Sequence, residues 1–135
     1  MGRLALLLFL AACAPLTAQA LLPYPGGFAE GGLVGGRFQV VLPGAPLFLD
    51  ADEKALYAAY PYELLRYDGL ALESQPLPGV PTFLRARPGL VVGLGKAVYT
   101  EKALLPYPAK DAALLEEGLF WVGEGGLYRE GVRLQ

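Results

Sequence analysis

The sequence contains no histidine, no asparagine and no isoleucine, and its only cysteine is Cys13. Without histidine, Ser-His-Asp and Cys-His catalysis and the usual zinc sites are excluded. Beyond residue 20 the aliphatic hydroxyls are Ser74, Thr82 and Thr100, and a lone cysteine cannot form a disulfide within one chain. We therefore expect no cofactor, no metal and no familiar nucleophile, and a fold that depends on its apolar core.

Charge is also sparse, at 18% of residues with a net charge of −2, and the basic residues are scattered. Nucleic-acid binding needs clustered Lys and Arg, so that class of partner is excluded. Hydrophobic residues make up 54% of the chain, which indicates a folded state despite 12 prolines and 18 glycines. Few thermolabile residues and many loop prolines also fit a heat-adapted protein.

The amino terminus has the pattern of a signal peptide. Met1 to Arg3 form a short positive region, and residues 4–12 form an apolar run that is too short to cross a bilayer. Residues 10–13, Leu-Ala-Ala-Cys, resemble the bacterial lipobox, in which the cysteine is lipidated. The sequence Ala18-Gln19-Ala20 is an alternative cleavage site that would release a soluble protein.

We favour lipidation at Cys13. The expected organisation is a signal peptide over residues 1–20 and one all-β repeat domain over residues 21–135. The expected location is extracytoplasmic, as a membrane-anchored lipoprotein, with a soluble periplasmic or secreted protein as the alternative.

Short strands dominate the rest of the chain, because prolines or glycines interrupt nearly every stretch of ten residues. The segments expected to be strands are residues 38–42, 47–50, 55–60, 64–67, 82–87, 90–94, 97–100, 112–117, 119–123 and 127–129.

The chain is internally repetitive. Glu30 to Leu33 and Glu124 to Leu127 both read EGGL, and Leu21 to Pro25 and Leu104 to Pro108 both read LLPYP. Hairpin turns ending at residues 37, 69, 102 and 131 recur about every 30 residues, as in a repeat architecture. Each unit is about four short strands, and proline-containing linkers at residues 43–46 and 78–81 lie between units.

Four-stranded antiparallel units repeated head to tail are the plan of a β-propeller. Residues 118–131, GLFWVGEGGLYREG, resemble the propeller repeats of bacterial two-component regulators, and residues 56–69, LYAAYPYELLRYDG, resemble them more loosely. The resemblance implies an all-β, incomplete propeller-like array of about three and a half repeats, with a compact β-sandwich or barrel as the alternative. It implies a fold much more than an activity. No kinase or DNA-binding module accompanies the repeats in this sequence.

The candidate ligand-binding residues are an aromatic group with one arginine: Tyr60, Tyr62, Arg66 and Tyr67, next to Tyr57. Aromatic rings with an arginine can bind carbohydrate or peptide, although Tyr is also an ordinary strand residue. Trp121 is interpreted as a packing residue between sheets.

Carboxylates are the remaining catalytic candidates. Asp50, Asp52 and Glu53 lie at an expected turn and lack the spacing of a recognised calcium loop, which favours a solvated turn. Asp68 and Glu101 lie at equivalent turns of two repeats and could form an acid/base pair.

Two function classes follow from these observations. The favoured one is a non-catalytic extracytoplasmic binding or scaffold module of the cell envelope, and the alternative is a carboxylate-dependent glycan-active enzyme, either a glycosidase or a lyase. The last repeat has no polar cap, so we expect self-association or another envelope protein as partner, with a glycan or peptide as the other candidate ligand.

Overall fold

The computed structural model describes residues 21–135, which form sixteen strands and no helix. The expected signal peptide and Cys13 lie outside the described residues. The strands form four antiparallel sheets of four strands each, in sequence order within every sheet, and no sheet closes into a barrel. The chain is therefore all-β, as expected, and its four sheets are compatible with a propeller-like arrangement.

Each sheet is a meander with short turns. Sheet 1 contains β1 (Leu21–Tyr24), β2 (Gly27–Glu30), β3 (Leu33–Gly36) and β4 (Val40–Val41). Sheet 2 contains β5 (Phe48–Ala51), β6 (Leu56–Tyr60), β7 (Glu63–Tyr67) and β8 (Leu72–Pro76). Sheet 3 contains β9 (Phe83–Arg85), β10 (Val91–Gly93), β11 (Val98–Thr100) and β12 (Leu104–Leu105). Sheet 4 contains β13 (Asp111–Leu115), β14 (Gly118–Gly123), β15 (Gly126–Arg129) and β16 (Val132–Arg133).

The chain divides into two compact units, one ending at Pro46 and the other spanning Leu47–Gln135. In the first unit, the buried hydroxyl of Tyr24 connects β1 to the end of the sheet. It donates to the carbonyl of Gly35 at 2.8 Å and accepts the N–H of Phe38 at 2.9 Å. These bonds satisfy a buried polar group and hold the wide β3–β4 turn.

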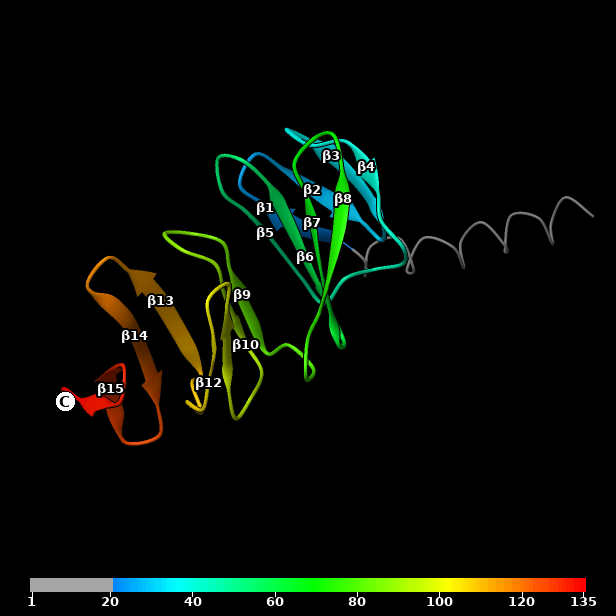
Figure 1. Cartoon of the computed structure of the whole chain (residues 1–135). Coiled ribbons are helices and arrows are strands. Elements are labelled where there is room, and N and C mark those ends of the chain that lie inside the picture. Colours follow the sequence, from blue (N-terminus) through cyan, green and yellow to red (C-terminus); the bar gives the residue numbers. More distant parts are fainter. Residues whose placement is uncertain (1–20) are drawn as a thin grey trace, which may run out of the picture. The chain divides into compact units, whose positions relative to one another are not determined.

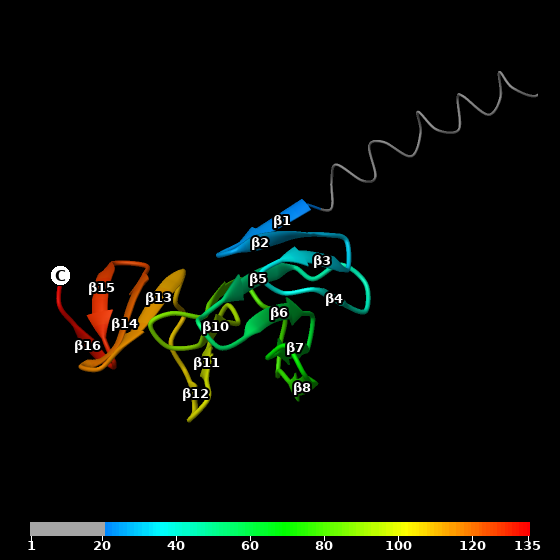
Figure 2. The ribbon, with the colours of Figure 1, turned by 90° about the horizontal axis from the view of Figure 1, so that it is seen from above.

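The second unit is a stack of sheets 2, 3 and 4. The first strands contact one another, β5 with β9 and β9 with β13. The fourth strands β8, β12 and β16 lie at the outer edges of their sheets (Figures 1 and 2). Contact at the first strands, with the fourth strands at the outer edges, is compatible with consecutive propeller blades.

Two apolar clusters fill the spaces between these sheets, and β10 contributes to both. Val92 packs in the cluster with Tyr57, Ala59 and Leu64 of sheet 2, whereas Val91 packs in the cluster with Trp121 of sheet 4. Successive strand residues point to opposite faces, so a strand that is covered on both sides needs apolar residues at adjacent positions. This requirement explains the Val-Val pair.

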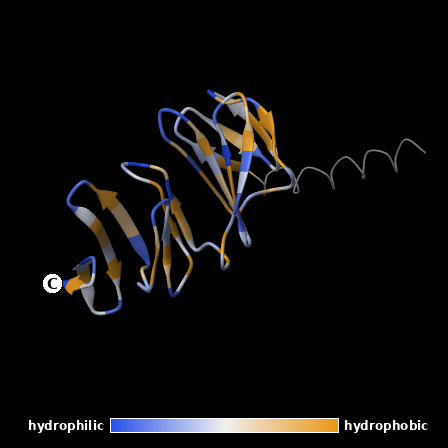
Figure 3. Cartoon of the chain, in the orientation of Figure 1, coloured by the Kyte–Doolittle hydropathy of each residue, from blue (hydrophilic) through white to orange (hydrophobic). Residues whose placement is uncertain are grey.

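Most turns of the second unit are hydrophilic (Figure 3). The fourth strand of sheet 2, β8, reads Leu-Glu-Ser-Gln-Pro and is exposed along its whole length. Charged residues and proline on an edge strand discourage pairing with another chain. The polar β8 therefore keeps this edge from extending the sheet.

The sequence predictions are largely confirmed at the level of strands. The predicted turns that end at residues 37, 69, 102 and 131 follow the third strand of each sheet. Residues 112–117, predicted as a strand, form most of β13 and the turn after it. The count of repeats was wrong, because sheet 1 is complete and not a half unit. The LLPYP match does not mark equivalent positions, since the first copy includes β1 and the second includes β12.

Candidate functional site

The predicted aromatic group is divided between both faces and both ends of sheet 2. Tyr60 is buried, and burial, with a smaller contribution from Glu63, raises the pKa of its hydroxyl to about 12. Tyr62 lies in the β6–β7 turn with a φ of 64° and is 61% exposed. Tyr67 ends β7, where its hydroxyl donates to the carbonyl of Gly69 at 3.0 Å. These three tyrosines do not form one surface.

Arg66 is the predicted residue that the structure places in a polar network. It lies opposite Tyr57 on one neighbouring strand and opposite Glu73 on the other. Its Nε donates to the Tyr57 hydroxyl and its Nη1 donates to Glu73 Oε1, both at 3.4 Å. The Tyr57 hydrogen bond raises the pKa of Arg66, and burial raises the pKa of Tyr57 despite that bond. The guanidinium is held in one direction and keeps its charge.

Arg66 borders a cleft between sheets 2 and 3 of about 220 Å³, here called the Arg66 cleft. It is lined by Tyr57, Leu64, Arg66, Glu73, Ser74, Gln75, Leu90, Tyr99 and Glu101. Burial first, and then Glu101, raise the pKa of Tyr99, so its hydroxyl stays protonated at neutral pH. Two phenol rings, one cation and two carboxylates thus converge at one opening between consecutive sheets.

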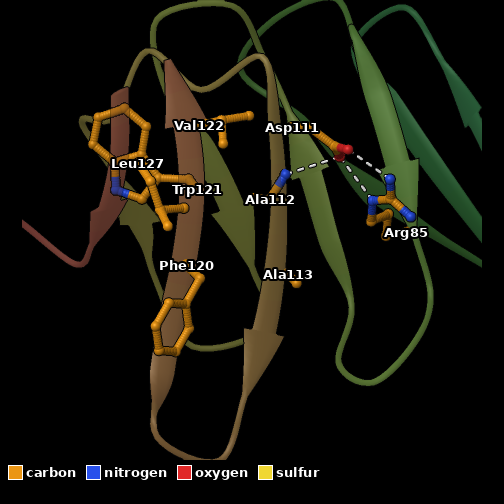
Figure 4. Close-up of a pocket in the computed structure, with 8 residues that line it drawn as sticks. All are labelled: Arg85, Asp111, Ala112, Ala113, Phe120, Trp121, Val122 and Leu127. Carbon is orange, nitrogen blue, oxygen red and sulfur yellow. Dashed lines mark hydrogen bonds and ion pairs between the residues drawn. The ribbon is translucent and has the colours of Figure 1, made fainter. Parts of the chain in front are cut away.

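A second candidate lies on sheet 4, beside an ion pair that connects it to sheet 3. Asp111 of β13 faces Arg85 of β9 (Figure 4), with Nε to Oδ1 at 2.7 Å and Nη2 to Oδ2 at 2.6 Å. The Arg85 hydrogen bonds lower the pKa of Asp111, with a smaller contribution from the Ala112 N–H, and the same pair raises the pKa of Arg85. This geometry is the bidentate form of the arginine–carboxylate pair.

The hollow next to this pair has a volume of about 230 Å³. Ala113, Phe120, Val122 and Leu127 line its apolar part (Figure 4). Because apolar side chains surround a charge that is already paired, the hollow offers packing surface and few groups for a polar ligand.

The turn carboxylates have structural partners. Asp52 Oδ1 accepts the N–H groups of Lys54 and Ala55, both at 2.8 Å. Asp50 Oδ2 accepts the Ala86 N–H at 2.8 Å, which connects sheet 2 to sheet 3. Within residues 21–135 no group of three or more metal-ligating side chains is assembled.

The proposed acid Asp68 also holds a turn. Its Oδ1 accepts the N–H of Leu70 at 2.8 Å and that of Ala71 at 2.9 Å, and these bonds lower its pKa. In the next repeat the Thr100 hydroxyl does the same for Lys102 and Ala103, at 3.3 and 3.1 Å. The structural equivalent of Asp68 is therefore Thr100, and Glu101 lies one position later. The turns are equivalent, as expected, but the two carboxylates are not.

Trp121 belongs to the packing between sheets 3 and 4. Its ring is 6% exposed and stacks between Tyr107 and Tyr128, with centroid distances of 5.1 and 4.2 Å and interplanar angles of 10°. Its Nε1 donates to the carbonyl of Glu130 at 2.8 Å. A ring with both faces covered is not available to a ligand.

Comparison with protein-family models, with curated proteins and with solved structures finds no match for the chain. Within the described residues, no helix has the length and hydrophobicity needed to cross a membrane. The candidate sites therefore rest on the geometry of the chain itself.

Proposed function

We propose that the chain is a non-catalytic extracytoplasmic binding or scaffold module of the cell envelope, whose ligand enters the Arg66 cleft. The observation that carries the proposal is the convergence of Tyr57, Arg66, Tyr99 and Glu101 at an opening between sheets 2 and 3. These residues come from two consecutive repeats, so the cleft exists only when the sheets are stacked.

The chemistry of the cleft favours a small, polar and partly apolar ligand. Tyrosine rings offer apolar faces to a sugar or a side chain, and a guanidinium donates to hydroxyl, carbonyl or carboxylate oxygens. A volume of about 220 Å³ is below the range of about 300 to 1,000 Å³ that is typical of drug-sized ligands. We therefore propose that one sugar ring of a glycan, or one side chain of a peptide, occupies it.

The structural partners of the carboxylates support a non-catalytic function. Asp68 and Asp52 accept backbone N–H groups in their own turns, and Asp111 is paired with Arg85. The resemblance of residues 118–131 to the propeller repeats of two-component regulators is consistent with this reading, because such repeats are structural units. Lipidation of Cys13 would place the module on a membrane surface.

Binding to a panel of cell-envelope glycans and peptides tests the proposal. We expect a ligand whose affinity falls at least about tenfold in Arg66→Gln and is unchanged in Arg133→Gln, an arginine of the last strand. Equal affinities in the two variants would place the ligand elsewhere.

The same panel is screened for turnover. An activity on glycans that Asp68→Asn or Glu101→Gln abolishes would replace the binding module with the carboxylate-dependent enzyme.

A further inference from the structure

We infer that two copies of this chain associate head to tail, with sheet 4 of one copy packing on sheet 1 of the other. This inference is independent of the ligand of the Arg66 cleft. It comes from comparing equivalent strand positions in the four sheets, within each compact unit separately. In the second unit the front face of a sheet is the one turned toward the preceding sheet, and the back face is the one turned toward the following sheet. In sheet 1 the front face is the one that carries the equivalent strand positions.

The turn between the second and third strands aligns the sheets. In sheet 4, Gly123 pairs with Gly126 at this turn, and Trp121 lies two residues before Gly123. The Trp121 side chain is on the front face of sheet 4, against sheet 3. In sheet 1, the residues that pair at the corresponding turn are Glu30 and Leu33, and Phe28 lies two residues before Glu30. Phe28 is thus the front-face equivalent of Trp121, but it is 52% exposed.

The rest of the front face of sheet 1 is also apolar and uncovered. The residues that share this face with Phe28 include Leu21, Leu33 and Val41, all exposed, and its charged member is Glu30. On the opposite face of the same sheet, Tyr24, Ala29 and Val34 are buried. An apolar face that stays exposed while the opposite face is covered marks an interaction surface.

The back face of sheet 4 is the complementary surface. Val122 stands one residue before the turn, and its equivalent in sheet 2, Ala59, is buried in the cluster that sheet 2 forms with sheet 3. Val122 is 41% exposed and lies with Phe120 and Leu127 beside the apolar hollow of Figure 4. Within residues 21–135 no following sheet covers this position of sheet 4, whereas sheet 3 covers its equivalent in sheet 2.

Charge also distinguishes the two faces. The front face of sheet 1 carries Glu30, whereas the back face of sheet 4 carries Arg129, beside Phe120, and Asp111, whose charge Arg85 already pairs. Glu30 and Arg129 are thus opposite charges on the two faces. Opposite charges on two otherwise apolar faces favour their contact over that of either face with itself.

A second copy is the occupant that fits both faces at once. The described residues present one uncovered front face, on sheet 1, and one uncovered back face, on sheet 4. A head-to-tail contact made twice by two copies leaves neither of them exposed. We therefore expect a closed pair and not an open filament.

The test uses two variants of the full chain, each with a charge on one face. Phe28→Asp alters the front face and Val122→Asp the back face, and both side chains are exposed enough for the chain to fold. Leu70→Asp is the matched control, since Leu70 is 95% exposed in the β7–β8 turn and lies on neither face. Circular dichroism checks that each variant keeps its fold.

Sedimentation is expected to show a dimer for the unaltered chain and for Leu70→Asp. The two face variants are expected to dissociate at least about tenfold more readily, because an unpaired charge is buried in the contact. An equimolar mixture of the two face variants retains one intact contact and should form mixed dimers. A monomeric unaltered chain, growth beyond two copies, or sensitivity to one face variant alone would each overturn the inference.

Photo-crosslinking locates the contact directly. With benzoyl-phenylalanine at position 28, the dimer-sized product after trypsin digestion should contain the peptide of residues 111–129. A dimer-sized product crosslinked to residues 21–37 instead would show that sheet 1 pairs with itself and would overturn the head-to-tail contact.

Discussion

Trp121 contributes to stability through both faces of its ring and through its nitrogen. Tyr107 and Tyr128 cover the faces, and the Glu130 carbonyl accepts the N–H. We expect Trp121→Ala to lower the free energy of unfolding by about 3 to 5 kcal/mol, the cost of a large cavity. Leu70→Ala is the control, since the Leu70 side chain is 95% exposed and its truncation leaves no cavity. Equal losses in urea titrations would contradict the assignment of Trp121 to packing.

The Arg85–Asp111 pair makes stability depend on pH in one direction. The pKa of Asp111 is lowered in the folded chain, so the pair stabilises fully above the unfolded pKa of about 3.9 and is lost as pH falls through the lower folded pKa. Because both side chains are about half exposed, we expect Asp111→Asn to cost only about 0.5 to 1 kcal/mol at pH 7. Thermal melts should show this difference shrinking below about pH 4. A constant difference from pH 7 to pH 2 would exclude the ion pair as its source.

At the scale of one element, β10 depends on a glycine that no turn requires. Gly93 is buried at the end of this strand, and a Cβ there would overlap the ring of Phe83 on β9. We expect Gly93→Ala to destabilise the chain by about 1 to 3 kcal/mol through overpacking. Gly79→Ala is the matched control, because the Cβ would meet only ordinary contact with Leu94 at 3.9 Å. If urea midpoints shift equally, the close approach of Phe83 has no energetic consequence.

Most strands of sheets 2 to 4 could be predicted from sequence, because apolar runs and turn residues alternate at short intervals. The strands of sheet 1 were harder to predict. Gly27, Gly35 and Gly36 lie within β2 and β3, where glycine is usually a sign of a turn. The edge strand β8 is mostly polar, so no apolar run predicts it. The strands β12 and β16 have two residues each, which is too short for an apolar run to be recognised.

The candidate site was predictable only for Arg66 and its strand neighbour Tyr57. Tyr60 could have been separated from them, since Tyr57 and Tyr60 are three residues apart in β6 and so point to opposite faces. Tyr99 and Glu101 come from the next repeat, and their position depends on how sheet 3 packs on sheet 2. The Arg85–Asp111 pair, 26 residues apart, depends on the packing of sheets 3 and 4 in the same way.

At the scale of the whole molecule, the stacked sheets of the second unit depend on one another. In the second unit sheet 3 is covered on both faces, by clusters shared with sheets 2 and 4, so its stability is the sum of two interfaces. Sheet 4 contributes to one of these clusters only. Within this unit, a partner would therefore add most to stability at sheet 4.

Anchoring through Cys13 is a prediction about residues outside the described structure. If the lipobox of residues 10–13 is used, the chain should partition into the detergent phase and Cys13→Ser should move it to the aqueous phase. Each buried CH₂ of the lipid contributes about 0.8 kcal/mol, so removal of acyl chains should reverse the partitioning completely.

Ala20→Lys is the control for the competing cleavage site. It disrupts Ala18-Gln19-Ala20 without changing residues 10–13, so a lipoprotein should keep its detergent partitioning in this variant. Mass spectrometry of the mature amino terminus then decides between the two routes. A lipid-modified Cys13 as the first residue is the expected result, because Leu-Ala-Ala-Cys directly ends the apolar run. A free amino group on Leu21 would instead identify a soluble exported protein, and the prediction of a lipid anchor at Cys13 would be wrong.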